Sequence, residues 1–161
     1  MRRNAYLILC IVAVSILMVS CSIFKKSEMP SGVQEQFFGD WTVNKLINTG
    51  TPSQLGEEEV NNIIGKHITY SKEQAKFEEN ECETPFYKEQ TISDGDITYM
   101  FKTTYRGMGI ESQNPPAMIE VYRDKNFNDL WDSFGDTFFI KDSNTLVVPF
   151  AGSFFELKRA E

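Results

Sequence analysis

The chain of 161 residues has a formal net charge of −7, and Phe, Tyr and Trp make up 13% of it. Because acidic side chains outnumber basic ones, the composition argues against a nucleic-acid-binding protein, which must neutralise phosphates. The aromatic content predicts a folded domain with its own core and excludes a disordered chain.

The amino-terminal stretch has the order of a secretory signal. Arg2 and Arg3 begin it, residues 5–19 are apolar apart from one serine, and the small Ser20 precedes Cys21. The apolar stretch is shorter than the ~20 residues that a transmembrane helix needs. We therefore predict export with cleavage before the cysteine. An uncleaved membrane anchor and an ordinary cleaved signal are the alternatives.

Residues 17–21, LMVSC, resemble the lipobox of bacterial lipoproteins. The resemblance implies removal of residues 1–20, a diacylglyceryl thioether on the Cys21 sulfur and an acyl group, such as palmitate, on its new amine. Each buried methylene contributes roughly 0.8 kcal/mol, so several acyl chains hold a protein firmly at a membrane. The implied location is the cell envelope. Ser22 in place of Asp implies the outer membrane, if the cell has one.

The rest of the chain divides into two parts. Residues 21–32 are predicted to be the lipidated cysteine and a flexible tether, because they are rich in Ser, Lys, Pro and Gly. Residues 33–161 are predicted to form one domain. Since Cys10 leaves with the signal and Cys21 is lipidated, Cys82 has no partner for an internal disulfide. It is expected to be buried, with an intermolecular partner as the alternative.

Alternating apolar residues predict about eight strands with two inserted helices. The first strand opens at Gly39, with Trp41, Val43 and Ile47 on one face. A short helix is expected over residues 56–64, and a loop over residues 79–81. The predicted strands cover residues 39–47, 66–70, 75–78, 86–92, 117–123, 138–141, 146–150 and 154–159.

The second helix is predicted over Asp94–Arg106. Ser93 is a candidate N-cap, and Gly107 is a natural stop. Apolar residues recur at helical spacing through this stretch: Ile97, Met100, Phe101, Tyr105 and Met108. A strand is the alternative, because Ile97, Tyr99 and Phe101 also alternate. We interpret the stripe of methionine and aromatic residues as core packing rather than a ligand site.

Residues 38–41, FGDW, resemble the Gly-x-Trp start of the first strand in lipocalins and other calycins. In that superfamily a cation from the last strand packs across the tryptophan. Arg159, Phe155 and Leu157 are alternate residues, so they share one face of the last strand. Arg159 is therefore expected to lie over Trp41 as a cation–π pair at the barrel base. Residues 139–142, FIKD, and residues 154–159, FFELKR, resemble the strand end and the carboxyl-terminal strand of small bacterial lipocalin-like proteins. The resemblance implies a mainly β, lipocalin-like antiparallel barrel of about eight strands.

A lipocalin-like barrel implies non-enzymatic binding of a small apolar or amphiphilic ligand. The candidate ligand-lining residues are Tyr70, Phe77, Phe138, Phe150 and Phe155. A barrel filled by its own side chains is the alternative. It would make the chain an envelope protein-interaction module, or an inhibitor of a secreted enzyme, and its acidic surface would suit a cationic partner.

The sequence carries few signals for chemistry. His67 is the single histidine, so it has no second histidine with which to share a metal. There is no Gly-x-Ser-x-Gly elbow and no glycine-rich phosphate loop. We therefore predict a protein that is not an enzyme, with no cofactor and no metal site.

Overall fold

The computed structural model describes residues 31–49, 53–111 and 114–160. The predicted signal peptide, Cys21 and the tether up to residue 30 lie outside the described residues. In chain order the elements are α2 (Ser31–Phe37), β1 (Gly39–Thr49), α3 (Glu57–Ile63), β2 (His67–Tyr70), β3 (Gln74–Phe77), β4 (Asn80–Glu83), β5 (Phe86–Thr91), α4 (Asp94–Phe101), the 3₁₀ helix η1 (Arg106–Met108), β6 (Ala117–Tyr122), β7 (Thr137–Asp142), β8 (Thr145–Phe150) and β9 (Ser153–Arg159).

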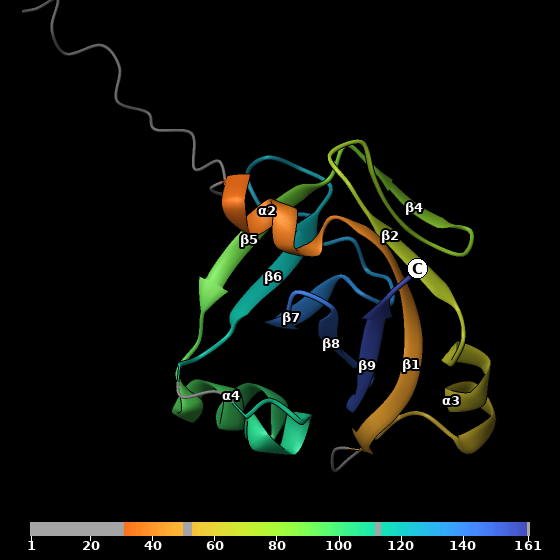
Figure 1. The fold of residues 1–161 in the computed structure, drawn as a ribbon, viewed down its shortest axis with the longest axis vertical. Helices are drawn as coiled ribbons and strands as arrows, with labels where there is room; N and C mark the ends of the chain where they lie inside the picture. The colour runs from red at the N-terminus through yellow and green to blue at the C-terminus, as the bar shows by residue number, and fades with distance from the viewer. Residues whose placement is uncertain (1–30, 50–52, 112–113, 161) are drawn as a thin grey trace, which may run out of the picture.

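The strands of the described chain form one antiparallel sheet in the order β4-β3-β2-β1-β9-β8-β7-β6-β5. This order is a meander in which the first strand also pairs with the last. The two edge strands, β4 and β5, are consecutive in the chain. The sheet curves into a half-barrel (Figure 1). The predicted mainly β class is confirmed, and the half-barrel is consistent with a lipocalin-like barrel.

The described sheet has nine strands, where about eight were predicted. The additional strand, β4, begins inside the stretch that was expected to be a loop. Its residues pair with β3, and Ala75 lies opposite Cys82. Cys82 is the only buried residue of the strand. A four-residue strand with one apolar side chain shows no alternation, so the pattern missed it.

Alternation along the strands places neighbouring apolar residues on opposite faces of the sheet. Phe138 belongs to the cluster inside the half-barrel, and Phe139 belongs to a second cluster on the outer face. The segment containing α4 and η1 covers this outer cluster with Ile97 and Met108. Neighbouring apolar residues of β7 and β8, Phe138 with Phe139 and Val147 with Val148, are therefore buried on opposite faces of the sheet.

Aromatic side chains fill the interior of the half-barrel. The ring centroids of Tyr70 and Phe138 are 4.5 Å apart, and Phe37 from α2 lies 5.2 Å from Phe138. From the loop before β7, Phe134 approaches Phe77 with a centroid distance of 4.7 Å. These distances are those of rings in direct contact, about 4.5–7 Å. The protein's own side chains thus occupy the interior.

The helix after Ser93 is shorter than predicted. The Ser93 hydroxyl accepts a hydrogen bond from the Asp96 N–H at 3.2 Å, which confirms the N-cap. The helix ends at Phe101, because Lys102 takes a left-handed conformation with φ of 54°. Residues 103 and 104 are β-branched threonines, which lose side-chain freedom in a helix. The extension to residue 106 is therefore wrong, and the strand alternative is wrong as well.

Two irregularities in β1 reverse part of the predicted face pattern. The register with β9 shifts between Val43 and Lys45, and again between Leu46 and Asn48. Such bulges change the face that later side chains occupy. Leu46 packs against the interior cluster and Ile47 against the outer one, so the prediction for Ile47 is wrong.

The predicted short helix before β2 is confirmed as α3. Its first turn contains three glutamates, which suit the positive end of the helix dipole. Val60 is buried, and Gly65 follows the helix with φ of 84°. Ile64 is 38% exposed, since it follows the last residue of the helix.

Gly135→Ala is expected to destabilise the fold. Gly135 has φ of +86°, and an added Cβ would clash with Ile68 Cδ1 and lie 2.5 Å from Tyr70 Oη. Such strain lowers the free energy of unfolding in urea by roughly 1–3 kcal/mol. Gly95→Ala in α4 is the control, because the nearest atom lies 3.8 Å from its added Cβ. Equal losses in the two variants would contradict the packing at Gly135.

Candidate functional site

The structure brings Trp41 and Arg159 together at one end of the half-barrel. The two residues are paired across β1 and β9. The guanidinium carbon of Arg159 lies 4.3 Å from the centre of the Trp41 ring. The indole is fully buried, and its Nε1–H donates to the Phe37 carbonyl at 2.8 Å. The cation–π contact that the lipocalin resemblance implied is therefore present.

Arg159 also connects separate segments of the chain. Its guanidinium donates to the carbonyls of Gln36 at 2.7 Å and Phe38 at 2.8 Å, and its Nε–H donates to the Ser143 carbonyl at 3.1 Å. Gly39 permits this approach, because a Cβ there would lie 2.8 Å from an Arg159 nitrogen. The glycine of the Gly-x-Trp motif thus makes room for the cation that covers the indole.

The predicted ligand-lining residues lie in or against the packed interior cluster. Four of them belong to the interior cluster: Tyr70, Phe77, Phe138 and Phe155. The Tyr70 hydroxyl donates to the Gly135 carbonyl at 2.8 Å, and burial raises the pKa of Tyr70 well above its ordinary value. The fifth residue, Phe150, is half-buried, packs against this cluster and also lines a groove.

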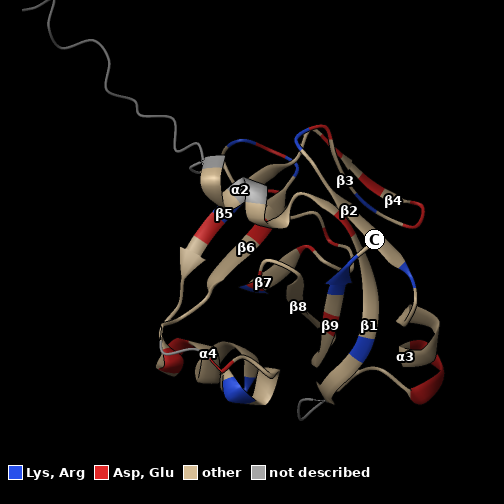
Figure 2. Cartoon of the chain, in the orientation of Figure 1, with Lys and Arg blue, Asp and Glu red and all other residues tan. Residues whose placement is uncertain are grey.

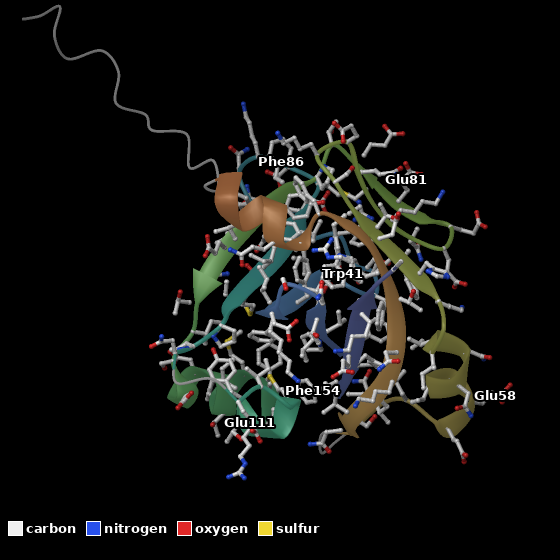
Figure 3. All side chains as sticks on the ribbon, viewed as in Figure 1. Trp41, Glu58, Glu81, Phe86, Glu111 and Phe154 are labelled. Atoms are coloured by element: carbon white, nitrogen blue, oxygen red, sulfur yellow. The ribbon has the colours of Figure 1, made fainter. Side chains whose placement is uncertain are left out.

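This groove, which we call the rim groove, has a volume of about 460 Å³. It lies between α4 and the turn joining β8 to β9, at the end of the half-barrel away from α2 (Figure 1). Figure 3 shows Phe154 close to α4, whereas Trp41 lies toward α2. The lining residues are Met100, Phe101, Lys102, Met118, Glu120, Leu130, Asp136, Thr137, Pro149, Phe150, Ala151, Gly152, Ser153 and Phe154.

Sequence reasoning missed the rim groove, apart from Phe150. Met100 and Phe101 were interpreted as core packing, but Met100 is 51% exposed. The walls come from α4, β6, β7 and the β8–β9 turn, which are far apart in the chain. The only available signal in the sequence was Met100, a methionine at helical spacing. The structure leaves its side chain exposed.

Polar groups lie along one side of the rim groove. Glu120 accepts hydrogen bonds from the Tyr122 hydroxyl at 2.9 Å and from the Gln90 side-chain amide, and it pairs with Lys88 at 3.5 Å. Burial, together with the bond to Glu120, raises the pKa of Tyr122 to about 12. Asp136 is the second carboxylate of the groove. An apolar wall and an acidic side therefore face the same space.

The remaining candidates for chemistry are isolated. His67 is exposed, with Nδ1 3.1 Å from the Thr42 hydroxyl. Cys82 is buried in β4, and burial raises its pKa, so its thiol stays protonated. Among the residues that the structure describes, no group of three or more His, Cys, Asp or Glu side chains could hold a metal ion.

No family model, no curated protein and no solved structure matches this chain. Within the described ranges, no helix is both long enough and apolar enough to cross a membrane. We therefore infer function from the residues and distances described above.

Arg159→Gln is expected to lower the free energy of unfolding by about 2–4 kcal/mol, because it removes the cation–π contact and leaves backbone carbonyls without a donor. Arg159→Lys keeps the charge but loses the planar fork, so we expect an intermediate loss. The control is Lys125→Gln, at an exposed lysine in the loop after β6. Urea unfolding followed by tryptophan fluorescence measures the losses, and equal stability of Arg159→Gln and Lys125→Gln would contradict this account.

Asp136→Asn is expected to gain stability relative to the unsubstituted chain as the pH rises. Burial raises the folded-state pKa of Asp136, and Asp132 and Glu120 add to the shift, while hydrogen bonds from Thr137 oppose it. A raised folded-state pKa means that ionisation costs more in the folded chain, so the carboxyl destabilises the fold above its unfolded pKa of about 3.9. Urea titrations between about pH 3.5 and 7 measure the difference. A pH-independent difference would contradict the assignment.

Proposed function

We propose that this chain is an exported, lipid-anchored binding protein without enzymatic activity, which takes a small apolar or amphiphilic molecule. Residues 17–21 support export and anchoring, because their lipobox-like order offers Cys21 for acylation. The rim groove supports binding. Its volume of about 460 Å³ and its apolar walls carry the proposal, since ligand sites are typically concave and mostly apolar.

The rim groove suits a ligand better than the interior does. A ligand inside the half-barrel would displace packed rings such as Tyr70 and Phe138, whose centroids are 4.5 Å apart. Truncating a buried aromatic side chain costs roughly 3–5 kcal/mol, which indicates the size of that penalty. In the groove, Met100 is already 51% exposed. Covering it removes apolar surface from water at about 25 cal/mol per Å².

The groove favours an amphiphile with an apolar body and a positively charged or hydrogen-bond-donating end. Met100, Phe101 and Phe150 offer apolar contacts. Glu120 and Asp136 offer carboxylate oxygens on the other side. Lys88 pairs with Glu120 and Lys102 also lines the groove, so a donor group that is only weakly cationic is also compatible.

Met100→Asp is expected to abolish binding of an apolar fluorescent dye or of a long-chain amine, because it places a charge in the wall of the rim groove. Tyr99→Asp is the matched control. Tyr99 is the neighbouring α4 residue, is 78% exposed, and does not line the groove. Fluorescence titration measures both affinities. Unchanged binding by Met100→Asp, or equal loss in the two variants, would exclude the groove.

Cys21→Ala is expected to abolish acylation and release the chain from membranes, because the acyl chains need the cysteine sulfur. Metabolic labelling with palmitate and intact-mass analysis of the mature protein check this. A freely soluble product with an unmodified thiol would contradict the anchor, whatever the groove binds.

A protein-interaction role is the second candidate, and the acidic surface favours it. Figure 2 shows acidic residues on α3 and on the β3–β4 hairpin. The exposed glutamates there include Glu57, Glu58, Glu59, Glu78 and Glu81. This surface would suit a cationic partner, such as a secreted enzyme that the chain inhibits. Met100→Asp separates the two roles, because a partner on the acidic surface would still bind that variant.

A further inference from the structure

Three lysines on the outer face of the sheet surround one buried carboxylate. The Nζ atoms of Lys45, Lys141 and Lys158 lie 3.6, 3.8 and 3.9 Å from carboxylate oxygens of Glu156. The Glu156 side chain is 9% exposed, whereas the lysine side chains are 59%, 30% and 47% exposed. We call these four residues the lysine cluster. In Figure 2, blue bands on β1 and at the end of β9 accompany the red band of β9.

The lysine cluster is a cationic site on an acidic chain. It combines three positive charges with one negative charge, while the whole chain has a net charge of −7. Like charges that converge on one carboxylate repel each other, and Glu156 offsets only one of them. An anion with two negative charges would complete the balance.

The ammonium groups of the cluster keep hydrogen-bonding capacity. The distances of 3.6–3.9 Å to Glu156 exceed those of N–H···O hydrogen bonds, about 2.7–3.2 Å. Glu156 instead accepts a hydrogen bond from the Asn44 side-chain amide at 3.0 Å. Lys158 donates to the Thr145 hydroxyl at 2.7 Å, which orients its ammonium. Each ammonium has three donors, so protons remain for a further acceptor.

A β-bulge builds one side of the lysine cluster. The register shift between Val43 and Lys45 lets the consecutive side chains of Asn44 and Lys45 both reach Glu156. Regular alternation would send them to opposite faces. Bulges are common where a side chain must be redirected, often beside functional sites. The cluster is two residues along β9 from Phe154, and none of its members lines the rim groove.

We propose that the lysine cluster binds a phosphate group, carried either by a phosphomonoester lipid headgroup or by a free phosphate. A phosphomonoester has a charge of about −1.5 to −2 at pH 7, which matches the excess charge of the cluster. Its three terminal oxygens can accept from three separate ammonium groups. The proposal does not depend on what the rim groove binds.

Titration of the full chain in neutral detergent with inorganic phosphate tests this site. We expect saturable NMR shifts at the Asn44 side-chain amide and at the backbone amides beside Glu156. Lys45→Gln and Lys141→Gln are each expected to weaken binding by about fivefold or more, because each removes a charge-assisted hydrogen bond. Lys125→Gln, at an exposed lysine outside the lysine cluster, is the matched control and should leave the affinity unchanged.

A second arm uses water-soluble short-chain phosphatidic acid, with phosphatidylcholine of the same chain length as its control. Tighter binding of phosphatidic acid than of inorganic phosphate, lost in Lys45→Gln, assigns a lipid headgroup. Equal binding of the two probes, lost in the same variant, assigns free phosphate. A response that does not saturate with either probe, or equal weakening by Lys125→Gln, overturns the proposal.

Discussion

The contact between Arg159 and Trp41 joins the two ends of the fold, and the rest of the sheet depends on it. β1 and β9 pair from Trp41 to Thr49, so neither the first nor the last strand is left as an open edge. The same guanidinium donates to carbonyls on both sides of Phe37 and thereby holds α2 over this end. The remaining edges, β4 and β5, are adjacent in the chain. The Tyr87 hydroxyl of β5 donates to the Ser71 carbonyl, in the turn between β2 and β3, at 2.8 Å.

With α2 held in place, the interior becomes a solid core. Phe37 enters it from α2, and Phe134 enters from the loop before β7. Both proposed binding sites therefore lie outside this core. β9 shows this division most clearly, because Phe155 and Leu157 face the core, while Phe154 lines the rim groove and Glu156 organises the lysine cluster. One strand thus contributes to the core through one face and to both proposed sites through the other.

Sequence patterns predicted the strands with clear alternation and the contact between Trp41 and Arg159. Both predictions rest on local properties, which are the alternation of residues along a strand and the Gly-x-Trp motif. Sequence patterns failed where tertiary structure decides. β4 has one buried side chain, Cys82, and so has no pattern to detect. Ile47 changed face because of bulges that only pairing with β9 creates. The rim groove could not be predicted, because four separate segments build it and because Met100 lies on a helix whose end is set by the left-handed Lys102.

We propose that an amphiphile binds outside a half-barrel filled by its own side chains. Methyl NMR of the full chain, labelled at methionine Cε and isoleucine Cδ1, distinguishes binding in the rim groove from binding in the interior. Met100 and Met118 line the rim groove, whereas Ile68 and Ile140 belong to the interior cluster. Addition of a long-chain amine is predicted to shift the two methionine methyls at the lowest concentrations and to leave the two isoleucine methyls unchanged. Shifts that begin at Ile68 and Ile140, with Met100 and Met118 unaffected, would contradict the account.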